Sequence, residues 1–463
     1  MVWRLRFRGG AVLVGVAAAL VLGSAAARPL VTREGVLPPG TELFEDDTLE
    51  EPTELFVSEL AGRGRSYRLN LGDILFSSPA ILGGLARRAG ISCNTCHREG
   101  AGNARLFVPG LSSRPGTFDT TGPSFNPKAD NGRFDPVRVP SLRGARRLAP
   151  YGHDGRFGSL RAFIRHVVVD EFAGPEPSDQ VLDALVTYVE DIAFLPNAKL
   201  APDGRLTERA SAAARRGEAV FRRPFPHDPS LSCAACHDPA QGFVDHRLHD
   251  VGSGGPVKTQ TLRNANFNAP YFHDGRYATY AEVIAHFDRH YDLGLAEGDR
   301  ADLLAYLEAV GDADKPLTRR TVRSERDALG QLARVFDKAV AEQNREVIAL
   351  AVEAIGNEWR ELAENFPGPK DTALKAGVAE RLHAAEAVRA VVLSLRRLAM
   401  AADRGEFPAA ARALADYRRE VAAASGKLLR AAPFSLFDPG ARKAHLRALE
   451  ALTALGAPAP QKR

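Results

Sequence analysis

Four cysteines and two histidines form two copies of one short pattern. The copies read Cys93-Asn94-Thr95-Cys96-His97 and Cys233-Ala234-Ala235-Cys236-His237, and together they use every cysteine of the chain. C-x-x-C-H is the attachment pattern of c-type haem, in which both thiols bond to the porphyrin and the adjacent imidazole binds the iron. A thioredoxin-like pair or a zinc site are the alternatives. However, we see no βαβ pattern, and a four-thiolate zinc site needs no histidine after each pair. We predict two covalently bound haem c groups, attached through Cys93, Cys96, Cys233 and Cys236, with His97 and His237 as proximal ligands.

A longer segment is repeated after each motif. Leu142-Arg143, Ala149-Pro150-Tyr151 and His153-Asp154-Gly155-Arg156 recur 120 residues later as Leu262-Arg263, Ala269-Pro270-Tyr271 and His273-Asp274-Gly275-Arg276. The Asp-Gly pairs predict turns. Apolar residues at three-to-four spacing predict helices at about 160–169, 178–194, 279–290 and 299–310. The repeat therefore predicts two mostly helical haem domains, at residues 66–200 and 201–315.

The N-terminus has the pattern of an export signal. Arg4, Arg6 and Arg8 precede an apolar run from Ala11 to Leu22, and three alanines then offer a small-residue cleavage site. An uncleaved membrane anchor is the alternative, although the run is short for a bilayer span. We predict a signal peptide at residues 1–27, a periplasmic mature protein, and membrane contact only through an uncleaved signal. An acidic N-terminal extension follows at residues 28–65, and we expect it to be an extended strap.

The last part of the chain, residues 316–463, has a different composition. It is rich in Ala, Leu, Glu and Arg at helical spacing, and Pro and Gly interrupt it, which predicts a bundle of about four helices. This segment is basic, whereas the haem region is acidic. It either docks on its own haem domains or recruits an acidic partner or membrane surface. Because the charge of the whole chain is only +4, we expect no nucleic-acid partner.

From about Leu71 to Asp292 the sequence resembles the bacterial di-haem cytochrome c peroxidases and their MauG relatives. The second half carries this resemblance most specifically, in Phe243-Val244-Asp245, Thr261-Leu262-Arg263-Asn264 and Ala269-Pro270-Tyr271-Phe272-His273-Asp274-Gly275. The resemblance implies a mainly α fold of two tandem cytochrome c-like haem domains, here followed by the C-terminal α-helical bundle. It also implies that one haem meets peroxide while the other handles electrons. Some members bind calcium between the domains, and the carbonyls of Asn268 and Pro270 fall at similar positions, so a candidate Ca²⁺ site is expected there.

The chain departs from the family pattern on the distal sides of the haems. Phe287 stands where the family places a Met or Tyr iron ligand, His153 replaces a Trp, and Arg161 stands where the family has an acid. No tryptophan is placed to bridge the haems. His166 and His286 occupy equivalent repeat positions and are candidate distal iron ligands, or else pack behind the haems. A loop histidine, His246 or His249, is a further candidate for an iron.

Two further histidines and three arginines belong to the predicted site. We expect His153 and His273 to be distal-pocket groups with a catalytic role, or parts of a structural turn, and we expect Arg156 and Arg276 near haem propionates. Arg161 is a third catalytic candidate.

We predict a periplasmic di-haem oxidoreductase that reduces hydrogen peroxide with electrons from a small cytochrome c or cupredoxin. The alternatives are high-valent haem oxidation of a protein or organic substrate, and a non-enzymatic di-haem electron carrier.

Overall fold

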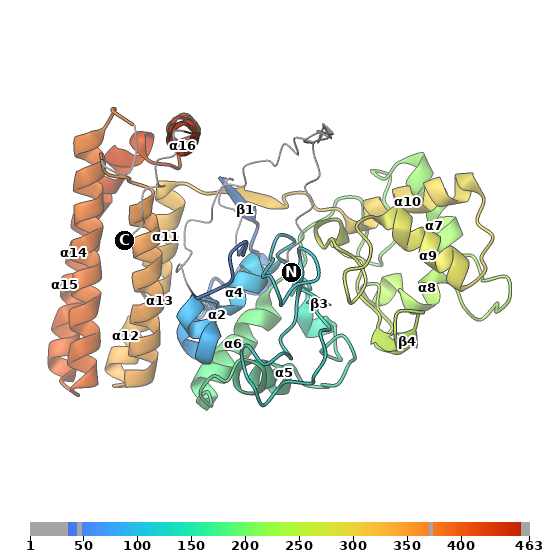
Figure 1. Cartoon of the computed structure of the whole chain (residues 1–463), viewed down its shortest axis with the longest axis horizontal. Coiled ribbons are helices and arrows are strands. Elements are labelled where there is room, and N and C mark those ends of the chain that lie inside the picture. The colour runs from blue at the N-terminus through green and yellow to red at the C-terminus, as the bar shows by residue number, and fades with distance from the viewer. Residues whose placement is uncertain (1–35, 44–48, 370–373, 455–463) are drawn as a thin grey trace, which may run out of the picture.

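The computed structural model describes residues 36–43, 49–369 and 374–454, and these are mainly helical, as predicted (Figure 1). The predicted signal peptide, residues 1–27, lies outside the described residues. Within the described part of the chain, no helix has both the length and the apolar character needed to cross a membrane.

Two crossing helices organise the first predicted haem region. Helix α2 (Tyr67–Phe76) packs against α6 (Asp179–Asp191), because both bury apolar side chains along the contact. Gly72 permits the close approach, since a Cβ there would lie 2.2 Å from the carbonyl oxygen of Ala184. The elements between them are η1 (Pro79–Ile81), α3 (Gly84–Ala89), α4 (Cys93–Cys96), η2 (Arg98–Gly100), η3 (Ala145–Arg147), α5 (Leu160–His166) and the π-helical turn η4 (Val167–Glu171).

The second region repeats this arrangement. Helix α7 (Ala212–Arg222) packs against α10 (Glu297–Gly311), and Gly217 lies at the crossing, where a Cβ would be 1.9 Å from the carbonyl oxygen of Asp302. The predicted helix at 279–290 corresponds to α9 (Tyr280–His290), whose N-cap Thr279 forms a capping box with Glu282. The remaining elements are α8 (Cys233–Cys236), η5 (Pro239–Gln241) and η6 (Ala265–Phe267).

The C-terminal segment is helical but divided more finely than predicted. Helices α13, α14 and α15 are long and pack side by side in sequence order, with Trp359 Nε1 of α13 donating to the hydroxyl of Tyr417 in α15 at 3.2 Å (Figure 1). Shorter helices flank them because capping residues divide the helical pattern, such as Thr321 and Asn344. The elements are α11 (Val322–Leu332), α12 (Val335–Ala341), α13 (Arg345–Glu364), α14 (Val378–Asp403), α15 (Phe407–Ala431), η7 (Ala432–Phe434) and α16 (Pro439–Ala454).

The described residues form three short antiparallel strand pairs, one of which joins distant segments. The pair β1 (Glu50–Pro52) and β6 (Leu317–Arg319) ties the N-terminal extension, which also forms α1 (Val57–Leu60), to the start of the C-terminal segment, with Glu50 opposite Arg319. The other pairs are β2 (Thr117–Phe118) with β3 (Val137–Arg138), and β4 (Leu248–Asp250) with β5 (Pro256–Lys258).

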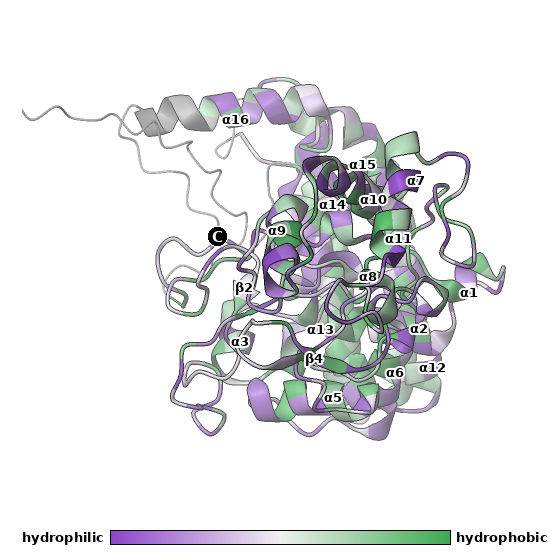
Figure 2. Cartoon of the chain, turned by 90° about the vertical axis from the view of Figure 1, so that its right-hand side faces the viewer, coloured by the Kyte–Doolittle hydropathy of each residue, from purple (hydrophilic) through white to green (hydrophobic). Residues whose placement is uncertain are grey.

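The buried apolar side chains divide unevenly between the regions. One large cluster includes α2 and α6 of the first region together with α11, α12, α13, α14 and α15. The view in Figure 2 shows apolar residues where α2, α6 and α13 lie. Two separate, smaller clusters fill the second region. Of the two readings of the C-terminal segment, these contacts support docking on the chain's own first region.

Candidate haem-binding sites

The first C-x-x-C-H motif forms a single helical turn, α4, with a rigid frame around it. Thr95 Oγ1 accepts from the backbone N–H of Ser92 at 3.0 Å, and the buried Asn103 amide donates to the carbonyl of Thr95 at 2.9 Å. His97 follows as the C-cap residue, and its Nδ1–H donates to the carbonyl of Pro140 at 2.8 Å. This bond fixes the ring tautomer and leaves Nε2 as the unprotonated nitrogen.

The second motif repeats this geometry in α8. Ser232 caps the turn by accepting from the backbone N–H of Ala235 at 3.0 Å, and the Nδ1–H of His237 donates to the carbonyl of Phe243 at 3.2 Å. Burial lowers the pKa of His237 and lowers that of His97 to about 4, so both imidazoles are neutral. A neutral imidazole held at Nδ1 by a carbonyl is the usual form of an iron or zinc ligand.

The donor set therefore fits covalent haem at each motif. In the described residues none of the four cysteines forms a disulfide. The four thiols do not converge on one metal either, since the metal-ligating side chains that gather in the described part of the chain include only one of them, Cys236. The alternative of a four-thiolate zinc site therefore has no support in the positions of the thiols.

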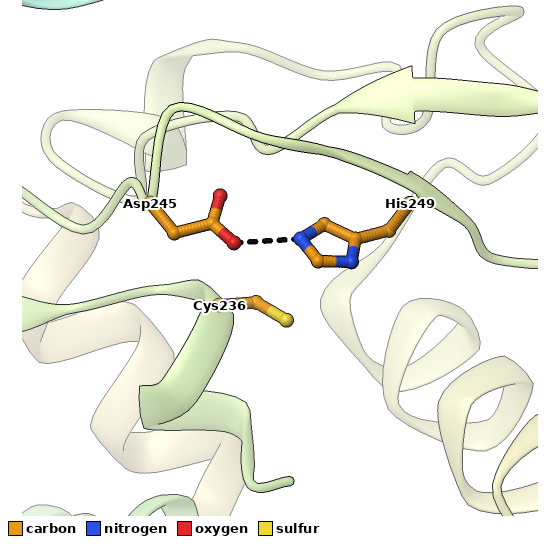
Figure 3. Close-up of side chains that lie close together, drawn as sticks. All are labelled: Cys236, Asp245 and His249. Carbon is orange, nitrogen blue, oxygen red and sulfur yellow. Dashed lines mark hydrogen bonds and ion pairs between the residues drawn. The ribbon is translucent and has the colours of Figure 1, made fainter.

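This group consists of Cys236, Asp245 and His249 and lies beside the second motif (Figure 3). His249 Nε2–H donates to Asp245 Oδ2 at 2.6 Å, and Cys236 Sγ lies within 4.8 Å of both ligating atoms. The other oxygen of Asp245 accepts from the hydroxyl of Thr259 at 2.7 Å, which holds the carboxylate in place. Because the Cys236 thiol belongs to the haem-attachment motif, we interpret Asp245 and His249 as neighbours of the attached haem. The other loop histidine, His246, donates from Nδ1 to the carbonyl of Ala149 at 2.8 Å.

The two candidate distal ligands are both engaged by other groups. His286 donates from Nε2 to the carbonyl of Val251 at 2.7 Å, and its Nδ1 accepts from the hydroxyl of Tyr277 at 2.9 Å. His166 Nδ1 donates to Asp170 at 3.0 Å, and its Nε2 lies 3.5 Å from a carboxylate oxygen of Glu171. Both nitrogens of the His286 ring are therefore hydrogen-bonded, and both nitrogens of the His166 ring face carboxylate oxygens.

Aromatic rings surround the position at which the family carries its Met or Tyr ligand. Phe287 packs against Phe272, with 5.6 Å between ring centroids, and against Tyr291 at 6.1 Å. Tyr291 is one helical turn further along, and the nearby Cys236 and Cys233 thiols add to burial in raising its pKa. The sequence prediction missed Tyr291. The i+4 spacing from Phe287 was the signal that could have found it.

His153 and His273 are brought together at the contact of the two haem regions, with 6.4 Å between ring centroids. The equivalent places of the repeat therefore meet, with the two rings tilted by 58°. The Nε2–H of His153 donates to the carbonyl of Arg138 at 2.8 Å, and burial lowers the pKa of His153 to about 3, so this imidazole is neutral. Burial also lowers the pKa of His273.

Each of the predicted arginines is paired with a carboxylate of its own haem region. Arg156 bridges Asp154 and the buried Glu171, and Arg276 pairs with Asp274 at 2.7 Å. Arg161 pairs with Asp179 at 2.6 Å and with Asp183 between α5 and α6, where 37% of its side chain is exposed. A propionate role for Arg156 and Arg276 and a catalytic role for Arg161 stay predictions.

A guanidinium stands at the predicted calcium position. Arg138 is 6% exposed, and its Nη1 donates to the carbonyl of Asn268 at 3.3 Å, one of the two carbonyls expected to bind Ca²⁺. A divalent ion about 4 Å from this guanidinium would meet a repulsion of roughly 8 kcal/mol at an effective dielectric constant of about 20. The arrangement does not fit calcium. Sequence analysis missed Arg138, although Arg138 and Lys258 are equivalent in the repeat.

Comparison with known proteins finds a family match for part of the chain. Residues 217–439 match the family model described as di-haem cytochrome c peroxidase. This part of the chain belongs to that family, which includes the MauG proteins. The match extends as far as the start of α16, over C-terminal helices that the motif-based resemblance did not cover.

Two curated relatives support the assignment. Methylamine utilization protein MauG of Methylorubrum extorquens is 25% identical over 300 residues, an alignment that covers 52% of this chain and 78% of the relative. Cytochrome c peroxidase Ccp of Escherichia coli is 40% identical over 67 residues, only 14% of either chain.

Two solved structures are similar at lower levels. A hydrazine synthase structure from Kuenenia stuttgartiensis, pressurised with xenon, aligns with a TM-score of 0.39 at 24% identity, over 61% of this chain and all of that one. A MauG-like protein associated with microbial copper homeostasis aligns with a TM-score of 0.37 at 17% identity, over 56% of this chain and 92% of that one. We draw no functional conclusion from these alignments.

Proposed function

We propose that this protein is a periplasmic di-haem c-type oxidoreductase that reduces hydrogen peroxide with electrons from a small cytochrome c or cupredoxin. In this proposal residues 1–27 are a cleaved signal, 66–200 and 201–315 are the two haem domains, and 316–463 are a helical bundle docked on the first. The observation that carries the proposal is the pair of C-x-x-C-H turns, each followed by a neutral histidine held at Nδ1 by a backbone carbonyl.

Each bound haem would supply a redox-active iron, and the residues of the chain would orient it and manage protons. Cys93 and Cys96 would hold the first haem and Cys233 and Cys236 the second, while His97 and His237 present Nε2 from the proximal sides. Reduction of one peroxide to two waters consumes two electrons, hence two reduced one-electron donors, and two protons. His153 stays neutral because burial lowers its pKa to about 3, and its Nε2–H is held by the Arg138 carbonyl, so it would act as a hydrogen-bonding group and not as a base.

The distal histidines favour an enzyme over an electron carrier. A carrier needs two firm ligands on each iron, whereas peroxide chemistry needs a position that is open or can open. His166 and His286 are hydrogen-bonded elsewhere, and Phe287 has no ligating atom. These contacts support an accessible iron.

Oxidation of a protein or organic substrate is the second candidate. Typical peroxidases have an acidic residue at the position of Arg161. Here Arg161 replaces this acid and is paired with Asp179 and Asp183, which favours a reaction other than simple peroxide reduction. This activity would use the same haems and would not require rapid turnover of a cytochrome donor.

The test begins with the purified, exported full-length protein. Acid–acetone extraction and a pyridine haemochrome assay should find two non-extractable haems per chain, and His97→Ala and His237→Ala should each change the spectrum of one haem. His383→Ala is the matched control, because His383 is an exposed histidine of α14.

Activity and spin state are then measured together. Peroxide-dependent oxidation of reduced cytochrome c, with a high-spin EPR signal from one ferric haem, is the expected result. Low-spin signals from both haems in every redox state, with no peroxide-dependent oxidation, would refute the enzyme and favour the carrier. A high-spin haem that reacts with peroxide but oxidises no donor would favour the second candidate.

A further inference from the structure

Equivalent strands of the two haem regions each donate one backbone hydrogen bond to the opposite region. Arg138 in β3 and Lys258 in β5 are related by the 120-residue shift of the repeat. The backbone N–H of Arg138 donates to the carbonyl of His273 at 2.7 Å, and the N–H of Lys258 donates to the carbonyl of His153 at 2.9 Å. The strand of each repeat is therefore joined by one backbone hydrogen bond to the His-Asp-Gly-Arg turn of the other.

The side chains of Arg138 and Lys258 also donate hydrogen bonds across this contact. Lys258 Nζ donates to the carbonyls of Leu148 and Pro150, both at 2.8 Å. Arg138 Nη1 donates to the carbonyl of Asn268 at 3.3 Å, and Asn268 is the repeat equivalent of Leu148. Each cation thus reaches the loop that precedes the Ala-Pro-Tyr segment of the opposite repeat.

Arg138 is buried and Lys258 is half-buried, and among the described residues neither forms an ion pair with Asp or Glu. Carbonyl and amide oxygens accept from the Lys258 ammonium and from the Nη groups of Arg138, whose Nη2 donates to Gln260 Oε1 at 3.2 Å. Arg138 Nε has no hydrogen-bond partner among the described residues. Burying a charged group is costly unless its hydrogen bonds are satisfied. Because this cost is met at two equivalent positions of the repeat, we infer that the two cations have a role at the contact of the haem regions.

We propose that the Arg138 guanidinium and the Lys258 ammonium are the interdomain cations of this protein, and that they join the haem regions in place of a divalent metal ion. Calcium binds six to eight oxygens, usually with carboxylates among them. Here the Asn268 carbonyl is already taken by Arg138. No cluster of acidic side chains suited to a metal lies at this contact within the described part of the chain.

The strand that carries Arg138 also leads to the proximal side of the first haem site. Pro140, two residues beyond Arg138, supplies the carbonyl that fixes His97. The cross-repeat bonds of Arg138 therefore hold the strand that orients this imidazole. Arg138 is a positioning residue for His97, and the inference is independent of which substrate the enzyme oxidises.

The experiment uses the holoprotein, first as purified without chelator and then after dialysis against EGTA. Metal analysis of the protein as purified should find no stoichiometric calcium, and the thermal unfolding midpoint and haem spectrum should be unchanged by EGTA or by added Ca²⁺. Arg138→Gln should lower the midpoint and perturb the spectrum of the first haem. Arg114→Gln is the matched control, because Arg114 also crosses between the repeats, to the carbonyl of Gly275 at 3.0 Å, but is exposed.

Specific results would overturn the inference. Stoichiometric calcium in the wild-type protein, or a midpoint that falls on chelation, would show that a divalent ion holds the interface. Equal effects of Arg138→Gln and Arg114→Gln on the midpoint and the spectrum would show that Arg138 contributes no more to the interface and to His97 than an exposed arginine does. If Arg138→Gln does not fold, Arg138→Lys replaces it and should remain insensitive to chelation, and sensitivity of this variant would also overturn the inference.

Discussion

The crossing of α2 and α6 makes a sharp prediction about Gly72. A Cβ at this position would lie 2.2 Å from the carbonyl oxygen of Ala184 and 2.6 Å from Cβ of Tyr188, whereas ordinary contacts begin at 3.4 Å. Gly72→Ala must therefore push the helices apart by about 1 Å. Overpacking of this kind costs about 3 kcal/mol at the upper end, and the better helix propensity of Ala returns about 1 kcal/mol. We expect a net loss of about 2 kcal/mol.

Denaturant unfolding of the holoprotein measures this loss, and the haem spectrum reports whether the first motif is disturbed. Gly356→Ala, in the middle of α13, is the matched control because its new Cβ would meet nothing within 4 Å. The control should be stabilised by up to about 1 kcal/mol, so the two substitutions should have opposite signs. A neutral or stabilising Gly72→Ala would show that the helices do not pack as closely as described.

The remaining predictions concern spin state and pH. His166→Gln and His286→Gln, each recorded by EPR, should leave the spin state of both ferric haems unchanged, because both rings are hydrogen-bonded away from an iron. A change of spin state in either variant would identify that histidine as a ligand. Burial, helped by Glu99 and opposed by Arg320, raises the pKa of Glu51 from 4.5 to about 8. The folded state then holds a proton that the unfolded state has lost, so this contribution to stability is present below pH 4.5 and disappears as pH rises through about 8. Glu51→Gln should therefore gain stability relative to wild type across this window, by roughly 2 kcal/mol after allowing for partial exposure. Denaturation curves at acidic and neutral pH measure this, and a difference that falls with pH would contradict the assignment.

Features set by local sequence were predictable. The C-x-x-C-H turns need only consecutive residues and a Ser cap, and α5, α6, α9 and α10 follow from apolar spacing and capping residues. The 120-residue repeat also predicted that His153 and His273 are equivalent. It did not predict that they meet, because a repeat in sequence does not say how its copies pack.

Features set by distant partners were not predictable. The ring of His286 is held by Tyr277 and by the carbonyl of Val251, 35 residues away, and no pattern in the sequence links these groups. Arg138 was overlooked for a similar reason, since its partners lie 122 and 130 residues further along the chain. The C-terminal segment gave the right composition for helices but not their number, because caps such as Asn344 resemble ordinary polar residues within a helical pattern.

The unequal distribution of the apolar core explains why these polar contacts matter. The first region shares its buried cluster with the C-terminal helices, whereas the second region fills clusters of its own. In the described residues, no buried apolar cluster spans the two haem regions. Their relative position must then depend largely on polar contacts. These include the bonds of Arg138 and Lys258, the cross-repeat bonds of Arg114 and His246, and the bond between Asn264 and Leu195. Directional hydrogen bonds fix a distance and an angle better than apolar packing does, and electron transfer between two haems requires both to be fixed. The two cations therefore contribute most by defining the geometry between the haem sites.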